Sequence, residues 1–364
     1  MLREPPAREP QLAPEWRARV LAPALVTADL PGIGGRIRTT LADFRVDEIP
    51  AYGADGSPGH LLLVLEKRGL ATEEAIGMIA RALAIHPRTI GYAGRKDAGA
   101  ITRQWISVPA AATDALARFE HEAITLGPAT PHSHKLRIGH LHGNRFDIVV
   151  RELAVDPETA LARARAKLAC IAERGGIPNA FGPQRFGRDG GGMDRGLEQM
   201  RRGRAGARAN MTVASGQAAL FNLWVELRTE RGCMAAVLEG DVLAKVATGG
   251  LFTSTDPDVD GARLVAREVA ITGPLYGSRT RMAPAGTPAA AIERDVLALA
   301  HIDESSLRAL GRAALGTRRR LLVSPTDVDV AIDDLSGLGV GLRLRFTLPA
   351  GSFATQLVRE LSMG

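Results

Sequence analysis

Strand-like segments lie at both ends of the chain, and the region between them has a different texture. Residues 41–49, 60–69 and 143–153 carry the alternating or apolar runs expected of β-strands, and residues 328–332 and 342–348 return to this pattern. The middle region, residues 187–323, is rich in glycine and arginine around one helical stretch at 216–232. Because 364 residues exceed what one hydrophobic core usually serves, this order predicts a discontinuous domain that carries an insertion.

Two helices are expected, one after the 60–69 strand and one after the 143–153 strand. The first begins at Thr72, which we expect to cap it, and presents Ile76, Ile79 and Leu83 on one apolar face. The second begins at the Asp-Pro pair 156–157, where the aspartate side chain can cap the helix and proline suits the first helical position.

Composition is that of a soluble globular protein, with 45% apolar and 24% charged residues. No apolar run approaches the roughly 20 residues of a membrane helix, and the first residues lack the unbroken apolar stretch of a signal peptide. The two cysteines, Cys170 and Cys233, form neither a CxxC motif nor a disulfide framework. These features predict a cytoplasmic protein that has no membrane partner.

The chain is basic, with a net charge of +6 and a pI near 9.8. Charge alone fits either a polyanionic partner or simple solubility. Two concentrated arginine runs, RRGRAGAR at 201–208 and RAALGTRRR at 312–320, favour nucleic acid, because arginine offers phosphate a bidentate fork.

Several cofactor and metal motifs are not supported. GIGG at 32–35 lacks the third glycine of a dinucleotide fingerprint, and no P-loop is present. His132, His134, His140 and His142 form a cluster, but no cysteine or HExxH accompanies it. A basic, partly exposed edge is therefore favoured over a metal site, and we expect neither a metal nor a cofactor.

The segment GYAGRKDAGAITRQWISV, residues 91–108, places Lys96 and Asp97 between glycines before a strand-like run. Taken alone, KDAG is typical of a surface turn. The longer pattern A-G-x-K-D-x-x-A-x-T-x-Q, however, resembles the signature of the TruD family of tRNA pseudouridine synthases. It is carried here by Ala93, Gly94, Lys96, Asp97, Ala100, Thr102 and Gln104.

Three further blocks resemble the same family, in the same order. They are KLRIGHLHGNRF at 135–146, IPNAFGPQRFG at 177–187 and LPAGSFATQLVRE at 348–360. The resemblance extends from Phe44 to Glu360, with one departure at Ala180, where the family block usually carries tyrosine.

The resemblance implies a fold and a domain division. The expected fold class is α+β: a pseudouridine synthase fold with a mixed, largely antiparallel sheet and flanking helices, into which an α/β TRUD domain is inserted. Residues 1–175 and 324–364 are expected to form the discontinuous catalytic domain, and residues 176–323 the insertion domain.

The resemblance also implies an activity. The expected reaction converts a uridine of tRNA, at position 13, into pseudouridine by breaking the glycosidic bond, rotating the base and forming a C–C bond. Asp97 is the expected catalyst, acting either as a nucleophile or as a base on the ribose C2′. A cation must keep this carboxylate ionised: Lys96 is one candidate, and the other arrangement has an arginine at Asp97 and Lys96 on phosphate.

Four further residues are expected to bind the substrate. Phe44, Phe146 and Phe353 match family positions that line the uridine site, and Asn144 can read the uracil edge with its donor and its acceptor. Core packing is the alternative for Phe44 and Phe146, which lie in alternating strands. Phe353 lies in a turn before a helix, where a ring more often faces a ligand.

The expected partner is tRNA, and no protein partner is required. Two other classes remain open: an RNA-binding protein without catalysis, and a nucleoside hydrolase. The first has less reason to keep the whole AGxKD block, and the second typically needs a metal or a carboxylate cluster.

Overall fold

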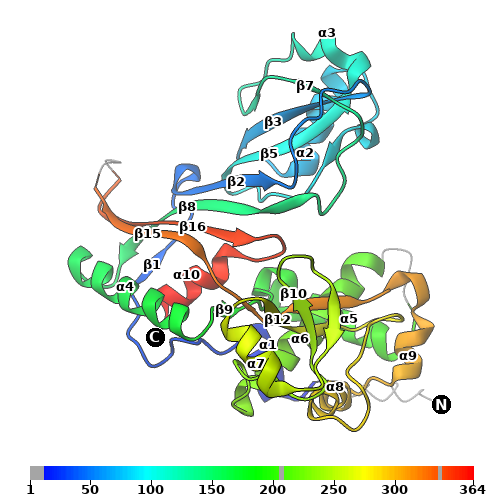
Figure 1. Cartoon of the computed structure of the whole chain (residues 1–364). Coiled ribbons are helices and arrows are strands. Elements are labelled where there is room, and N and C mark those ends of the chain that lie inside the picture. Colours follow the sequence, from blue (N-terminus) through cyan, green and yellow to red (C-terminus); the bar gives the residue numbers. More distant parts are fainter. Residues whose placement is uncertain (1–11, 205–208, 335–337) are drawn as a thin grey trace, which may run out of the picture. The chain divides into compact units, whose positions relative to one another are not determined.

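The structure is a computed structural model that describes residues 12–204, 209–334 and 338–364 (Figure 1). The chain forms two compact units. The first, here called the sheet unit, holds Asp29–Ala169, Pro325–Ala354 and Leu361–Gly364. The second, here called the helical unit, holds the residues up to Ala28, Cys170–Ser324 and Thr355–Glu360.

The sheet unit is built on one large sheet. Its main strand order is β15-β16-β8-β2-β5-β3-β6, with β1 on β8, β4 on β5 and β7 on β3. Every pairing is antiparallel except that of β2 with β5. The strands are β1 (Gly34–Arg36), β2 (Phe44–Pro50), β3 (His60–Arg68), β4 (Gly91–Tyr92), β5 (Ile101–Pro109), β6 (Ile124–Leu126), β7 (Thr130–His132), β8 (Leu141–Leu153), β15 (Thr326–Asp333) and β16 (Gly341–Pro349).

Helices accompany this sheet, so the expected largely antiparallel sheet with flanking helices is confirmed. The helices are α2 (Thr72–Ala82), α3 (Thr113–Leu116), α4 (Pro157–Glu173) and α10 (Ala354–Ser362), the last two of which pass into the helical unit. Short 3-10 turns lie at Leu41–Asp43, Pro87–Thr89 and Ala110–Ala112. The backbone N–H of Thr159 donates to Asp156, which confirms the predicted start of α4.

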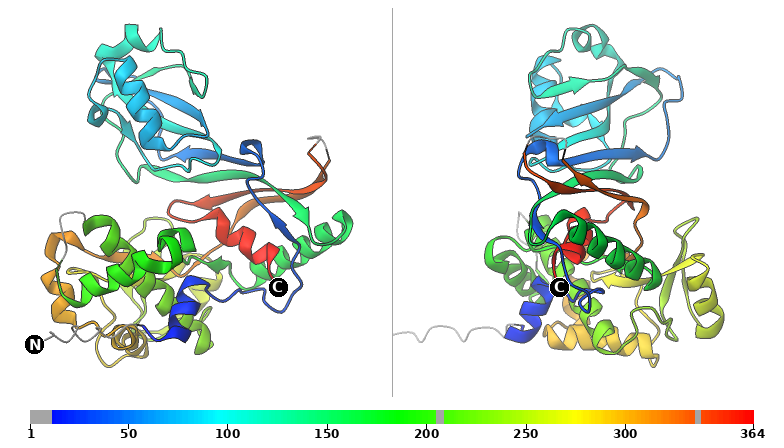
Figure 2. Two further views of the ribbon diagram at one scale, coloured as in Figure 1. Left: turned by 180° about the vertical axis from the view of Figure 1, so that it is seen from behind. Right: turned by 90° about the vertical axis from the view of Figure 1, so that its left-hand side faces the viewer.

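Helix α2 covers one face of β3 and β5 (Figure 2). Its Ile76 and Ile79 pack with Leu63 and Leu65 of β3, as its apolar periodicity predicts. The cap was predicted wrongly: Ala71 holds the cap position and Thr72 is the first helical residue. The Thr72 hydroxyl contacts the 93–100 loop instead.

A buried arginine joins three segments of the sheet unit. Arg151 of β8 contacts Asp43, just before β2, at 2.5 Å and Asp333 of β15 at 3.3 Å, and all three side chains are at most 4% exposed. Arg151 also donates to the carbonyl of Gly339 at 2.8 Å. One cation thus ties β8 to chain segments that are remote in sequence.

The helical unit combines helices with a four-stranded antiparallel sheet of order β11-β10-β12-β13. The four strands are β10 (Val242–Lys245), β11 (Leu251–Thr253), β12 (Val269–Leu275) and β13 (Thr317–Arg320), while β9 (Ile177–Pro178) and β14 (Leu322–Val323) pair as a separate two-stranded sheet. Its helices are α1 (Pro14–Leu21), α5 (Gly191–Arg201), α6 (Ala209–Glu230), α7 (Pro257–Val265), α8 (Pro288–Leu299) and α9 (Glu304–Ala309), with 3-10 turns at Pro183–Arg185, Arg188–Gly190 and Gly311–Ala313. Among the described helices, none combines the length and the apolar character needed to cross a membrane.

Two arginines of the run at 312–320 have partners inside the helical unit, whereas Arg312 is exposed, and contact of this run with nucleic acid stays a prediction. Arg318 contacts Glu293 of α8 at 2.6 Å, and these side chains are 2% and 3% exposed. Arg319 donates to Asn179 and stacks 4.2 Å from the ring centroid of Phe181. The linear charge pattern does not reveal these internal partners. Part of the other run, residues 205–208, lies outside the described residues.

We predict that Arg318→Met destabilises the protein, because it leaves the Glu293 carboxylate buried without its cation. Breaking one side of a buried ion pair typically costs about 3–5 kcal/mol. Thermal unfolding of the variant measures this loss. The control is Arg294→Met, which removes an exposed arginine beside Glu293 on α8. Equal stability of the two variants would contradict the structural role of Arg318.

Candidate active site

Asp97 lies in the loop between β4 and β5, and a buried lysine holds the backbone of that loop. Lys67, near the end of β3, is fully buried. Its ammonium donates to the carbonyl of Leu70 at 2.5 Å, to that of Asp97 at 2.9 Å and to that of Lys96 at 3.4 Å. The position of the Asp97 backbone is therefore fixed from inside the sheet unit.

Thr72 and Gln104 hold the same loop from a second direction. The backbone N–H of Lys96 donates to the Thr72 hydroxyl at 2.8 Å, and that hydroxyl donates to the Gln104 side chain at 2.8 Å. Gln104 in turn donates to the carbonyl of Gly94 at 3.2 Å. Both side chains are buried, so these hydrogen bonds do not compete with water.

Lys96 does not face the Asp97 carboxylate. Its ammonium contacts Glu48 of β2 at 2.6 Å, and the two side chains are 6% and 0% exposed. The other Glu48 oxygen accepts the backbone N–H of Trp105 at 3.1 Å. Burial in this pair leaves the Lys96 ammonium unable to reach a phosphate, and its contribution is to anchor the loop to β2 and β5.

An arginine pairs with Asp97 instead, as one half of the second arrangement considered from the sequence expects; the other half, Lys96 on phosphate, does not fit its buried pair with Glu48. The Arg38 guanidinium contacts the Asp97 carboxylate, which remains 66% exposed. The same guanidinium lies 4.3 Å from the centroid of the Phe44 ring. A guanidinium stacks through its face and donates through its edge, so Arg38 can do both at once.

Three rings continue from Phe44 across the sheet. Phe44 and Phe146 meet edge to face with centroids 6.5 Å apart, and Phe146 stacks on Phe346 at 5.2 Å. Asn144, two residues before Phe146 on β8, is half-buried. Its side-chain oxygen has no hydrogen-bond partner among the described residues.

The structure thus brings Asp97, Phe44 and Phe146 into one connected group through Arg38, and places Asn144 on the same face of β8 as Phe146. Phe44 and Phe146 are 2% and 6% exposed, so both rings also pack in the core. Phe353 lies half-buried in the turn between β16 and α10. The roles of these residues toward a substrate stay predictions.

A hollow of about 360 Å³ lies beside these strands. It is lined mainly by charged residues of both signs, among them Arg45, Asp47, Arg103 and Asp147. Phe146 lines it as well, so the hollow borders the group of rings.

Burial also changes the pKa of the Lys67 ammonium, which holds the Asp97 loop. It lowers the pKa of Lys67 to about 8, although the Asp97 carboxylate acts to raise it. Because this value lies below that of an unfolded chain, the unfolded state binds more protons between about pH 8 and 10.5. The contribution of Lys67 therefore makes the folded state gain stability as the pH rises through that window.

Sequence reasoning missed Arg38, Glu48 and Lys67. Arg38 lies 59 residues before Asp97, and no local pattern links the two. Lys67 is one of only five lysines in the chain, but it stands between Glu66 and Arg68 in the charged end of HLLLVLEKRG, which reads as an exposed strand end. Only the strand alternation, which turns the Lys67 side chain inward, could have indicated its burial.

The chain is similar to known proteins over most of its length. The family model of tRNA pseudouridine synthase D (TruD) matches residues 22–191 and 207–361. The chain belongs to the TruD family. Isomerisation of uridine to pseudouridine is the function of this family, as the resemblance implied.

Two relatives show how closely the chain follows the TruD family. It is 42% identical to tRNA pseudouridine synthase D of Anaeromyxobacter sp. (strain Fw109-5), over 93% of this chain and 95% of that protein. It is 40% identical to tRNA pseudouridine synthase D of Thermus thermophilus, over 92% of this chain and 91% of that protein. Both alignments cover nearly the whole length, so they include the sheet unit and the helical unit.

The fold agrees with a solved TruD structure. A crystal structure assigned as tRNA pseudouridine synthase D (TruD) from Methanosarcina mazei superposes with a TM-score of 0.73, at 23% identity, over 96% of this chain and 98% of that one. At this identity the likeness concerns the fold, and it confirms the predicted fold class.

We predict that Lys67→Met lowers turnover at least tenfold while the protein stays as stable as the wild type at pH 7. Methionine fills the volume and removes the cost of burying a charge, but it cannot donate to the carbonyls of Leu70 and Asp97. Single-turnover assays and thermal unfolding measure the two effects.

The matched control for this variant is Lys245→Met, which changes an exposed lysine at the end of β10. Wild-type turnover by folded Lys67→Met would show that the hydrogen bonds from Lys67 to the loop carbonyls are not needed for catalysis. A large loss of stability would contradict the expected relief of burial.

Proposed function

We propose that this TruD chain converts uridine 13 of tRNA into pseudouridine and that Asp97 is the essential catalyst. One observation carries the proposal: the Asp97 carboxylate is 66% exposed, while buried side chains hold its backbone and Arg38 holds its charge. A solvated turn needs no such support. The reaction is an isomerisation without net redox change, so we propose that no cofactor takes part.

The proposed chemistry uses the ionised form of Asp97. The bond between uracil N1 and ribose C1′ breaks, the base rotates, and C5 bonds to C1′ in place of N1. Asp97 attacks as a nucleophile or removes a proton from C2′, and both routes require a charged carboxylate in a defined position. The Arg38 guanidinium stabilises that charge and fixes its direction.

The proposed substrate contacts follow from the neighbouring groups. Asn144 has an oxygen without a protein partner among the described residues, which suits the N3–H of uracil, and its amide can donate to a uracil carbonyl. Phe353 is proposed to stack on the flipped uracil or its neighbour, and Phe44 and Phe146 to shape the wall behind Asp97. Lys96 is retained as a positioning residue that anchors the loop through Glu48.

The same proposal assigns each part of the chain to a domain. Residues 1–175 and 324–364 form the catalytic domain, and residues 176–323 form the insertion domain typical of the family. The enzyme works on tRNA in the cytoplasm and needs no protein partner.

One assay separates this proposal from its rivals. Unmodified tRNA is incubated with the protein, and the products are analysed for pseudouridine and for free uracil. Pseudouridine at position 13 supports the proposal. Free uracil indicates a nucleoside hydrolase, and binding without either product indicates an RNA-binding protein.

The sharpest prediction concerns Asp97→Asn. The amide keeps the size of the side chain and suits a turn as well as aspartate does, so folding should survive. The variant should bind tRNA at least as well as the wild type, because a negative charge near phosphate is lost, and it should form no pseudouridine above background. Mass spectrometry of the tRNA measures the product.

Two further variants control this experiment. Asp97→Ala excludes activity that slow deamidation of asparagine restores, and Asp114→Asn repeats the charge change at an exposed position on α3. Substantial pseudouridine formation by Asp97→Ala would return residues 94–99 to the category of a solvated turn.

We also predict that Phe353→Ala lowers turnover much more than thermal stability. A half-buried ring in a turn contributes less to the core than a buried one, whereas loss of a stacking ring weakens the flipped state by roughly 1–3 kcal/mol. Phe346→Ala is the comparison, since Phe346 is 1% exposed and its loss should cost about 3–5 kcal/mol of folding. If folded Phe353→Ala keeps full turnover, the ring does not stack on substrate.

A further inference from the structure

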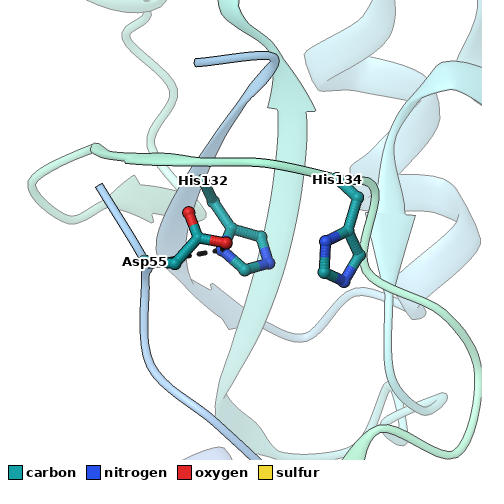
Figure 3. Close-up of side chains that lie close together, drawn as sticks. All are labelled: Asp55, His132 and His134. Carbon is teal, nitrogen blue, oxygen red and sulfur yellow. Dashed lines mark hydrogen bonds and ion pairs between the residues drawn. The ribbon is translucent and has the colours of Figure 1, made fainter. Parts of the chain in front are cut away.

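Two histidines and an aspartate gather at the end of β3 that is remote from Asp97. One donor atom from each of Asp55, His132 and His134 lies within 4.8 Å of the other two donors. The ring centroids of His132 and His134 are 4.6 Å apart, and Figure 3 shows Asp55 on the other flank of His132. The Asp55 carboxylate lies 3.2 Å from Nδ1 of His132.

Local structure explains why these side chains meet. His132 ends β7 and His134 follows two residues later, a spacing that places both side chains on one side of an extended chain. The 51–58 loop folds back on this segment: the backbone N–H of Gly56 donates to Pro131 at 3.0 Å, and that of Ser133 donates to Asp55 at 3.0 Å. Asp55 is thereby brought from 77 residues away to the side of His132.

His132 supplies a second, independent observation. It is 2% exposed, and its Nε2 has no hydrogen-bond partner among the described residues. A buried polar nitrogen without a partner is rare and requires an explanation. A metal ion held by this cluster would give the buried imidazole the partner that it lacks.

We propose that Asp55, His132 and His134 bind one divalent transition-metal ion of the zinc type. Imidazole nitrogen together with one carboxylate suits zinc and its neighbours, whereas magnesium and calcium prefer sites made of oxygen. Ligand atoms of a tetrahedral zinc lie roughly 3.4 Å apart, given bonds of about 2.0–2.2 Å. To bind one ion, the three donor atoms must approach one another by on the order of 1 Å. The exposed His134 and the 40% exposed Asp55 side chain have room for this movement.

Neighbouring groups define the limits of the site. His140 is engaged elsewhere, since its Nδ1 lies 2.7 Å from the Tyr52 hydroxyl. The Tyr52 ring stacks on His132 at 5.5 Å and closes one side of the cluster. Exposure of Asp55 and His134 leaves the opposite side open for a water ligand.

The site has a structural role in this proposal. An ion at Asp55, His132 and His134 ties the 51–58 loop to the end of β7. His60, opposite His132 on β3, and Lys67 are seven residues apart, about 23 Å along the strand. Removing the ion is therefore expected to lower stability and leave pseudouridine formation unchanged.

Calorimetric titration of the full, untagged protein with zinc chloride after chelator treatment tests the proposal. We expect the wild type to bind one zinc ion per chain and its unfolding temperature to rise with zinc. His134→Ala should bind zinc at least tenfold more weakly and lose the temperature shift. Asp55→Asn should also bind more weakly, although it keeps an oxygen that can accept from Ser133.

The matched control is His142→Ala, which removes an exposed histidine outside the cluster and should bind zinc like the wild type. Three results would overturn the proposal: no saturable binding by the wild type, equal binding by His134→Ala, or equal binding of magnesium. The first two exclude the site, and the third excludes its metal class.

Discussion

The antiparallel pairing of β8 with β16 is the constraint on which the sheet unit depends. It joins strands that lie before and after residues 170–324 of the helical unit, with Val150 opposite Leu342 and Gly143 opposite Pro349. Loop-closure entropy grows only slowly with loop length, so a long intervening segment adds little to its cost. Arg151 reinforces the arrangement, because Asp43 and Asp333 both need its charge in a buried position. The same ladder places Phe346 on Phe146, and β2 on its other side adds Phe44.

The candidate active site uses this rigidity to hold a loop that has no regular structure of its own. Buried donors and acceptors from β2, β3, β5 and α2 fix the backbone around Asp97, while the carboxylate itself stays exposed. The groups that fix the position of Asp97 are therefore different from the carboxylate itself. The side chains that set the geometry are buried, and the carboxylate that we propose to react is open to solvent.

Much of this architecture could be predicted from sequence, because strand alternation and the Asp156 cap are local signals. The pairing of Arg38 with Asp97 could not, since 59 residues separate two ordinary surface residue types. The same limit applies to Asp55, whose closeness to His132 depends on how the 51–58 loop folds back. In the arginine run, residue type alone could not distinguish an exposed phosphate-binding arginine from Arg318, which Glu293 neutralises internally.

Most of the lysines in this chain are buried. Only five of its 46 basic residues are lysines, yet Lys67, Lys96 and Lys167 are all buried. Lys67 meets three carbonyls, Lys96 meets a carboxylate, and Lys167 donates to the carbonyl of Met363 at 2.6 Å. A planar guanidinium presents its donors in one fixed fork, whereas an ammonium is a compact charge whose three donors can turn toward carbonyls from different directions. A buried arginine can also hold carbonyls, since Arg228 donates to those of Cys233 and Ala236. At Lys67 it is the ammonium that determines where the Asp97 backbone lies.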